Sequence, residues 1–202
     1  MNADFKINGK VLESKRLILR SFLPGDLYDF NEYASVPGVG EMAGWPHHKN
    51  LDETKDILDK FIKEDKTFAL IYKENEKVIG SLGVEFYGRE ESLTEFEGLI
   101  GREIGAVLSK DYWGRGIMCE AINEVSNYLF NDLDFDFLLA AYFLRNSQSK
   151  RLQEKCGFKA YRKLTIETVL GKKELSICTL LLNPNKDIKL SFSHPETLIY
   201  EK

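Results

Sequence analysis

Residues 103–122 read EIGAVLSKDYWGRGIMCEAI and are the most informative part of the chain. Its beginning has the pattern of a strand, and from Met118 onward apolar residues recur at helical spacing. Gly114-Arg115-Gly116 lies between the two. A strand, a glycine turn and a helix start predict an anion site, because the first N–H groups of a helix are unpaired and its dipole is positive there. The alternative is that the two glycines only form a tight strand-to-helix turn.

Outward from this stretch, the hydrophobic periodicity predicts seven strands and four helices. The expected strands are 13–22, 67–73, 77–87, 102–108, 135–143, 160–170 and 173–182. The expected helices begin after a cap at Asp26, cover 51–65, begin at Gly116, and cover 147–156 before a stop at Gly157. On the third helix, Glu120, Asn123, Glu124 and Asn127 are expected to face away from the core.

The element order is therefore β-α-α-β-β-β-α-β-α-β-β. It predicts an α+β fold, that is, a mixed α/β layered fold with a mostly antiparallel twisted sheet, one central β-α-β crossover and helices on both faces. The two strands that flank the crossover are expected to be parallel neighbours with a right-handed connection. We expect one domain over residues 1–182, followed by a C-terminal tail over 183–202 in which Phe192, Leu198 and Tyr200 would pack on the domain or on a partner.

Composition excludes several classes of protein. The 202 residues contain 28 Lys and Arg against 32 Asp and Glu, so a net charge of −4 gives no overall attraction to nucleic acid or anionic membranes. No apolar run approaches the length of a membrane span, and the N-terminus lacks the apolar region of a signal peptide. Three widely spaced cysteines and three histidines predict a cytoplasmic protein without a disulfide framework and without a metal.

The common nucleotide motifs do not fit the glycine turn. A P-loop requires G-x-x-x-x-G-K-[ST], which is absent from the chain. The dinucleotide motif requires a third glycine where this chain has Cys119. The sequence therefore disfavours ATP, GTP and NAD as ligands.

Two motifs together resemble a known family. EIGAVLSKDYWGRGIMCEAI, followed about 25 residues later by NSQSKRLQEKCGF at 146–158, closely resembles the GNAT N-acetyltransferases. The nearest branch is the Rim-type one (RimJ- and RimL-like), whose founding members acetylate the N-termini of ribosomal proteins. The resemblance extends in element order from Glu13 to about Leu182. It implies the GNAT acyl-CoA N-acyltransferase fold and transfer of an acetyl group from acetyl-CoA to a primary amine, either a protein N-terminus or a small molecule.

The resemblance also implies which residues hold acetyl-CoA. The pyrophosphate would bind backbone amides of the glycine turn, and the pantetheine arm would pair with the preceding strand. The residues implied for the pyrophosphate are Trp113, Gly114, Arg115, Gly116, Ile117 and Met118. Those implied for the pantetheine arm are Val107, Leu108 and Ser109. Trp113 and Met118 depart from the broad family pattern Q/R-x-x-G-x-G/A but match the Rim-type variant YWG-x-G-[IY]-[MA].

In the second motif, Asn146 resembles the family residue that hydrogen-bonds the pantetheine arm. Ser149 resembles a residue near the thioester sulfur that acts as general acid. The alternatives are structural, since Asn146 suits a helix N-cap and Ser149 suits a first helical turn.

The chemistry of an amine requires a base. A primary amine with a pKa near 10 is protonated at neutral pH and cannot attack a thioester until a proton is removed. Glu103 is the first candidate for the base and Glu85 the second, the alternative being that Glu103 is an exposed strand residue. His47 or His48 has a suitable ordinary pKa, but a Pro-His-His loop is typical of a surface.

The acceptor is expected between the first helices and the sheet. Tyr33, Trp45 and Phe86 are the candidate substrate-binding residues, together with Pro46 and Tyr87, and the alternative is that these aromatic rings are plain core. The acidic residues Glu90, Glu91, Glu95 and Glu97 would attract a cationic acceptor or simply form a solvated charge run. A non-catalytic CoA-binding sensor or interaction module on the same fold is the competing function, and the assembly is expected to be a monomer or a homodimer.

Overall fold

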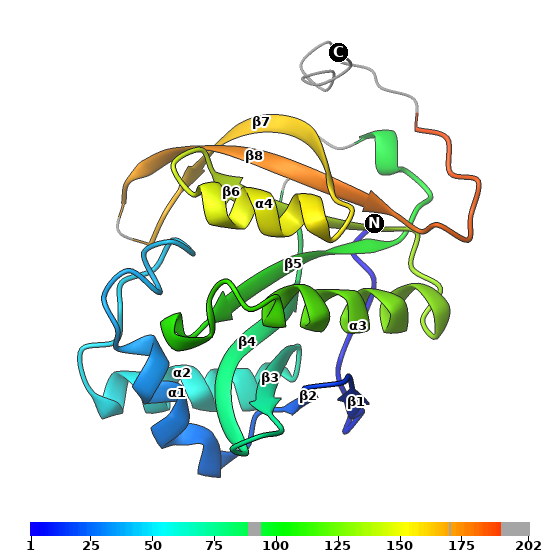
Figure 1. The fold of residues 1–202 in the computed structure, drawn as a ribbon. Helices are drawn as coiled ribbons and strands as arrows, with labels where there is room; N and C mark the ends of the chain where they lie inside the picture. The colour runs from blue at the N-terminus through cyan, green and yellow to red at the C-terminus, as the bar shows by residue number, and fades with distance from the viewer. Residues whose placement is uncertain (89–93, 170, 191–202) are drawn as a thin grey trace. The chain divides into compact units, whose positions relative to one another are not determined.

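The structure is a computed structural model that describes residues 1–88, 94–169 and 171–190 (Figure 1). Its strands are β1 (Leu12–Glu13), β2 (Leu17–Ser21), β3 (Thr67–Tyr72), β4 (Lys77–Glu85), β5 (Gly101–Leu108), β6 (Phe137–Phe143), β7 (Lys159–Glu167) and β8 (Lys173–Leu182). The helices are α1 (Leu27–Ala34), α2 (Leu51–Glu64), α3 (Ile117–Asn131) and α4 (Ser147–Lys155). Short 3-10 turns occur at Pro24–Asp26, Thr94–Phe96 and Lys110–Tyr112.

The predicted fold is confirmed. The eight strands form a mixed sheet in the order β1-β2-β3-β4-β5-β6-β8-β7. β5 and β6 are parallel, as expected of the two strands that flank α3, and the other recorded strand pairs are antiparallel. The very short β1 is the one strand that the periodicity did not predict, because two residues are too few to show an alternation.

The chain divides into two compact units. The first, here called the glycine-loop unit, consists of residues 5–84 and 105–124, and the second, the α4 unit, consists of residues 1–4, 85–104 and 125 onward. β5 runs from residue 101 to residue 108 and so contributes to both units.

The glycine-loop unit packs α1 and α2 over an aromatic core. Phe30 stacks on Phe61 with ring centroids 5.5 Å apart, and Phe22 lies against both rings. Tyr33 is 2% exposed within the same cluster, and Trp45 packs against it. Apolar side chains at helical spacing on α1 and α2 produce this core, as the periodicity predicts.

Two predictions for this unit need correction. Asp26 is the N-cap residue of α1, as predicted, but its side chain makes no capping hydrogen bond: the carboxylate accepts hydrogen bonds from the Arg20 guanidinium and the Leu23 N–H, which secures the 3-10 turn before the helix. His48 is not on the surface. It is 5% exposed and hydrogen-bonded to Thr54, and burial lowers the pKa of its imidazole.

The α4 unit is built on β6. β6 pairs with β5 from Phe137 to Leu139 and with β8 along its whole length, and α4 lies along it (Figure 1). As predicted, α4 ends before Gly157, which has a φ of +86° and therefore suits the C′ position.

The core of the α4 unit contains a stack of Phe96 on Phe137, with centroids 4.1 Å apart. The neighbouring Glu95 is not part of a solvated charge run, as one alternative had it, because it is buried and forms an ion pair with Arg162 at 3.3 Å. Glu90 and Glu91 lie outside the described residues, as do Phe192, Leu198 and Tyr200 of the tail.

Candidate functional site

The end of β5 has one backbone edge without a strand neighbour. β6 pairs with β5 only at Gly101–Glu103, although β5 continues to Leu108. On the opposite edge the Ser109 N–H donates to Ile79 O at 2.8 Å, and a Cβ on Gly80 would lie 2.4 Å from Val107 O. Backbone groups alternate between the two edges along a strand, so the Leu108 N–H faces the edge that lacks a strand. Among the described residues, this segment has no strand neighbour on one edge, so an extended ligand can add there by backbone hydrogen bonding.

The glycine turn follows directly. Trp113 has φ −66° and ψ 153°, and Gly114 has φ +74°, which is the conformation of the two central residues of a type II turn. Gly116 has φ +73° immediately before α3 begins at Ile117. Both glycines are required by the backbone, because a left-handed conformation is costly for residues with a Cβ. The two glycines therefore do form a tight turn, and this conformation does not exclude an anion site at the same place.

The turn leaves the start of α3 accessible. The first intrahelical hydrogen bond runs from Glu120 N–H to Gly116 O, so the N–H groups of Ile117 and Met118 have no acceptor within the helix. Residues 114–116 are exposed, whereas the side chains of Ile117 and Met118 are buried. An anion can therefore reach these backbone N–H groups while the side chains anchor the helix, and the helix dipole favours its negative charge.

Two side chains fix the turn to the rest of the glycine-loop unit. The Trp113 indole N–H donates to Leu108 O at 2.8 Å, which joins the turn to the end of β5. The Lys110 ammonium binds Pro37 O and lies 5.9 Å from the Trp113 ring centroid. Leu108 O and the Ser109 N–H therefore have protein partners, which leaves the Leu108 N–H as the better donor for a ligand on this segment.

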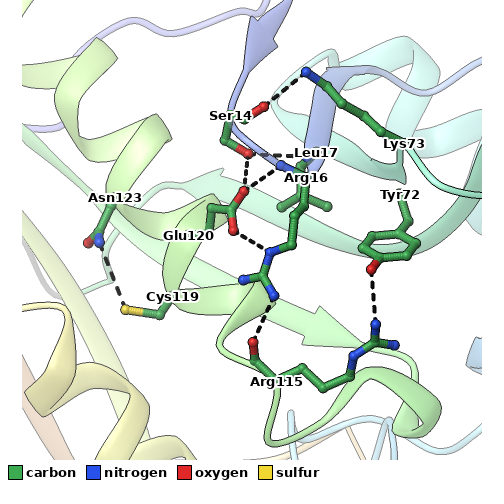
Figure 2. A network of polar contacts seen from close by, with 9 residues as sticks. All are labelled: Ser14, Arg16, Leu17, Tyr72, Lys73, Arg115, Cys119, Glu120 and Asn123. Carbon is green, nitrogen blue, oxygen red and sulfur yellow. Dashed lines mark hydrogen bonds and ion pairs between the residues drawn. The ribbon is translucent and has the colours of Figure 1, made fainter.

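Arg16, which the sequence analysis did not single out, brings positive charge to the start of α3 (Figure 2). Its Nε donates to Glu120 at 2.7 Å and its Nη1 to Arg115 O at 3.0 Å. Its Nη2 lies 3.9 Å from where a Cβ on Gly116 would be. The guanidinium thus lies beside the backbone groups that the glycine turn exposes.

Glu120 orients Arg16. It accepts hydrogen bonds from the Ser14 hydroxyl at 2.7 Å and from the Arg16 backbone N–H at 2.8 Å, in addition to the guanidinium (Figure 2). Burial alone would raise the pKa of Glu120, but these hydrogen bonds lower it, so the carboxylate is charged at neutral pH. Glu120 thus joins the first turn of α3 to the Ser14–Arg16 segment, a contact that the sequence did not predict.

Arg115 supplies a second cation. Its guanidinium donates to the Tyr72 hydroxyl at 2.9 Å (Figure 2). It also lies 5.4 Å from the ring centroid of Tyr72 and 5.3 Å from that of Tyr112, so aromatic contacts hold the side chain although the residue is exposed. Arg16, Arg115 and the N-terminus of α3 together form a compact positive region within the glycine-loop unit.

Glu103, the first candidate for the base, lies on β5 four residues before Val107. It is half-buried, and burial together with the negative charge of Glu85 raises the pKa of its carboxyl to about 7. A carboxyl group that titrates at neutral pH is suited to accept a proton from an amine. Glu103 therefore does not behave as an ordinary exposed strand residue.

Arg102, the neighbour of Glu103, points to the other side of the strand and is 2% exposed. Its Nε donates to Ala3 O at 2.6 Å, and its guanidinium lies 3.7 Å from the ring centroid of Phe86. Phe86, predicted to bind the acceptor, thus covers Arg102 and remains 59% exposed. Its outer surface is accessible to a ligand.

The other two predicted acceptor residues differ from each other. Tyr33 is buried in the core, which raises the pKa of its hydroxyl, and plain packing accounts for it. Trp45 is only partly buried, with its ring 5.2 Å from that of His48. His47 pairs with Glu41 at 2.7 Å, so the histidines of this loop have partners within the loop and α2.

Asn146 and Ser149 occupy the start of α4. Asn146 Oδ1 accepts a hydrogen bond from the Ser149 N–H at 3.0 Å, so Asn146 is the N-cap, as its structural alternative predicts. The Ser149 hydroxyl accepts from Gln153 Nε2 at 3.1 Å.

Comparison with known proteins decides the family. The model of the acetyltransferase (GNAT) domain matches residues 16–159, which is most of the chain. The chain belongs to the GNAT acetyltransferase family.

Two relatives of this GNAT protein carry similar descriptions. The chain is 31% identical over 129 residues to "Probable N-acetyltransferase YjcK" of Bacillus subtilis (strain 168), and the aligned residues cover 64% of this chain and 66% of the relative. It is 24% identical over 154 residues to "Uncharacterized N-acetyltransferase p20" of Bacillus licheniformis, which covers 74% of this chain and 82% of the relative.

Solved structures share the fold of this acetyltransferase. A GNAT-family acetyltransferase from Bacillus anthracis superposes with a TM-score of 0.73 at 22% identity, covering 86% of this chain and 98% of the other. The ribosomal-protein-S5-alanine acetyltransferase from Vibrio fischeri gives a TM-score of 0.66 at 21% identity, covering 89% and 98%. At these identities the likeness shows the fold.

Two further findings concern the described part of this acetyltransferase. Within it, no helix has the length and apolar character needed to cross a membrane. The same residues contain no cluster of three or more His, Cys, Asp or Glu side chains arranged to hold a metal ion.

Arg16 provides a first testable prediction for this acetyltransferase. If the start of α3 binds the pyrophosphate of CoA, as we propose below, Arg16→Gln should weaken CoA binding about tenfold, because a charge-assisted hydrogen bond to a phosphate contributes about 1.5–3 kcal/mol and solvent screens part of it. Calorimetric titration with CoA at low and moderate salt measures the loss, which should shrink as salt rises. Lys15→Gln, which removes the same charge from the exposed neighbour, is the matched control and should change affinity less than twofold. Equal affinities for Arg16→Gln and wild type would remove Arg16 from the site.

Proposed function

We propose that the protein transfers the acetyl group of acetyl-CoA to a primary amine, with Glu103 as general base. The observation that carries the proposal is the arrangement along β5. A carboxyl with a pKa of about 7, a backbone segment without a strand neighbour, and a glycine turn at an exposed helix start follow one another in that order. Transfer from acetyl-CoA to an amine requires a base that accepts the proton of the amine, a segment that binds the extended pantetheine arm, and a site that binds the diphosphate.

The residues fit acetyl-CoA as follows. The N–H groups at the start of α3, with Arg16 and Arg115, would hold the pyrophosphate, since anion binding at a helix start needs backbone donors and positive charge. The edge of β5 at Val107, Leu108 and Ser109 would pair with the pantetheine arm, chiefly through the Leu108 N–H. The family resemblance further assigns Asn146 to the pantetheine arm and the Ser149 hydroxyl to the thioester sulfur.

The proposed reaction begins when Glu103 accepts a proton from the ammonium form of the acceptor, directly or through water. The free amine attacks the thioester carbon and a C–N bond forms. The C–S bond then breaks with its electron pair on sulfur, while nitrogen loses its second proton to water and the sulfur gains one from water. Ser149 donates a hydrogen bond to that sulfur. The ammonium and acetyl-CoA thus give the acetamide, CoA as thiol and one proton, which Glu103 returns to water.

The acceptor class that we propose is a protein N-terminus. This choice is based on the resemblance of Tyr112–Met118 to the Rim-type variant of the glycine turn, and one neighbour in fold is described as a ribosomal-protein-S5-alanine acetyltransferase. Of the aromatic residues considered for the acceptor, Trp45 and Phe86 stay candidates, each within its own unit, because neither side chain is fully buried. We propose that the enzyme acts in the cytoplasm, in keeping with its three cysteines, which form no disulfide within the described residues.

Release of CoA thiol from acetyl-CoA with a panel of amines tests the proposal. The panel should contain peptides that match ribosomal-protein N-termini, lysine, polyamines and aminoglycosides. We expect turnover with N-terminal peptides, and kcat/KM should level off near pH 8, because an α-amino group has a pKa of about 7.7–8.0 and a lysine amine one of about 10.4. CoA binding without turnover of any amine would instead favour the non-catalytic sensor.

A further inference from the structure

Gln153 is a buried polar side chain on α4 that the family resemblance does not explain. It is 6% exposed and lies one helical turn after Ser149. A buried amide is costly unless its donors and acceptor are all satisfied. The partners of Gln153 therefore indicate why an amide stands at this position.

The amide of Gln153 is satisfied on both sides. Its Nε2 donates to Ala141 O on β6 at 3.0 Å and to the Ser149 hydroxyl at 3.1 Å. Its Oε1 accepts from the Thr179 hydroxyl on β8 at 2.6 Å. Thr179 is itself 3% exposed, so water does not compete for this contact.

These contacts determine which way the amide points. A backbone carbonyl can only accept a hydrogen bond, so the NH2 side of Gln153 must face Ala141 O. One of the two Nε2 protons is used there and the other is directed to Ser149. The Ser149 oxygen is consequently an acceptor in this contact, and its own O–H is free to donate elsewhere.

Ser149 is therefore held at two points. Asn146 Oδ1 binds its backbone N–H, and Gln153 Nε2 binds its side-chain oxygen. A hydrogen bond donated to a hydroxyl oxygen polarises the O–H bond and makes it a stronger donor. The arrangement both fixes the hydroxyl and assigns it the role of donor.

We propose that Gln153 is a positioning residue that keeps the Ser149 hydroxyl oriented as the hydrogen-bond donor to the sulfur that leaves in acetyl transfer. This inference is based on the proposed function and assigns one more residue to the same site. As the C–S bond breaks, its electron pair goes to sulfur and the Ser149 O–H donates to the developing charge. The proton that reaches sulfur through Ser149 is replaced from water, so the serine is unchanged at the end.

A purely structural role is the competing explanation, since Gln153 also joins α4 to β6 and β8. A double-mutant cycle separates the two. Gln153→Met keeps the length of the side chain and removes its donors, and Ser149→Ala removes the hydroxyl. We expect each single variant to lower kcat about tenfold with KM for acetyl-CoA unchanged, as befits a hydrogen bond to a developing charge. The double variant should be no slower than Ser149→Ala.

Thr179→Val extends the cycle. It keeps the shape of the side chain but removes the donor to Gln153 Oε1, so it should lower kcat by a smaller factor, and only when Ser149 is present. If Gln153→Met slowed kcat by the same factor with and without the serine, its effect would be structural and the inference would be overturned. Thermal melts of all variants report any loss of folding separately.

A binding measurement tests the inference even if no amine is acetylated. Desulfo-CoA lacks the sulfur, so its affinity relative to CoA isolates contacts to that atom. We expect the wild type to prefer CoA increasingly from pH 7 to pH 9 as the thiol ionises, and Ser149→Ala and Gln153→Met to lose this preference equally. A preference that persists in Gln153→Met, or is absent from the wild type, overturns the inference. Absence of turnover with every amine, by contrast, counts against the proposed function.

Discussion

Replacing Glu103 with Gln should lower kcat about 100-fold or more, while the fold becomes more stable above neutral pH. Removal of a general base typically costs a factor of about 100–10,000 in rate. The amide has nearly the same shape as the carboxyl but cannot accept the proton of the acceptor ammonium. Steady-state release of CoA thiol at saturating acetyl-CoA measures the loss, and CoA affinity should not change.

The stability change has a definite sign. Burial and Glu85 raise the pKa of the Glu103 carboxyl from 4.5 to about 7, so the folded state favours the protonated form. The ionised carboxylate therefore destabilises the fold, and this destabilisation is absent below pH 4.5, develops between pH 4.5 and 7, and is complete above it. Glu103→Gln should add about 1–2 kcal/mol at pH 8 after allowance for solvent screening, and almost nothing at pH 4.5. Urea unfolding at the two pH values measures the difference.

Glu85→Gln is the matched control, because it removes the other candidate base and the charge that helps to raise the pKa of Glu103. In the wild type, kcat should rise with pH through about 7 as Glu103 ionises. In Glu85→Gln this rise should move to lower pH with kcat at pH 8 largely retained. If Glu85→Gln abolished turnover and Glu103→Gln did not, Glu85 would be the base.

Gly116→Asp should weaken CoA binding by a factor of about 100 or more. The added carboxylate would stand at the start of α3, where it repels phosphate and can pair with Arg16, whose Nη2 lies 3.9 Å from the site of a Cβ. The loss combines steric exclusion with the removal of positive potential from the helix start. Calorimetric titration with CoA measures the affinity.

Gly116→Asn separates the charge from the backbone strain. Both substituents place a Cβ at a φ of +73°, and Asn and Asp tolerate this region better than other residues with a Cβ, so the two variants should be about equally stable. Asn adds bulk without charge and should weaken binding only about tenfold. Gly171→Asp makes the same change at a φ of +69° in the turn between β7 and β8, and it should leave CoA affinity unchanged. Wild-type affinity in Gly116→Asp would rule out the glycine turn as the pyrophosphate site.

Much of the fold follows from patterns of a few residues. The apolar positions of α3, the stop of α4 at Gly157 and the parallel pairing of β5 with β6 were all predicted from local periodicity, turn chemistry and chain order. These signals repeat within one or two turns of a helix or a few residues of a strand. Asp26 shows where such reasoning fails. Its carboxylate can accept a hydrogen bond from any nearby donor, and it binds the Arg20 guanidinium and the Leu23 N–H instead of an N–H group of α1.

The family assignment was predictable for the same reason, since the glycine turn and NSQSKRLQEKCGF are contiguous strings. The partners of the individual site residues were harder to predict from the sequence. Arg16 meets Glu120 across 104 positions of the chain, and Gln153 meets Thr179 across 26. A local pattern records neither pair, because each contact exists only after strands and helices have packed.

From the residues alone it follows that a strand, a glycine turn and a helix succeed one another, and hence that the chain belongs to an acetyltransferase family. The packed fold was needed to learn which charges lie beside that turn, how the Gln153 amide points, and that Glu103 has a pKa of about 7. Turn chemistry and conformational preference act between near neighbours in the chain. Electrostatics and desolvation depend on every group that folding brings within reach.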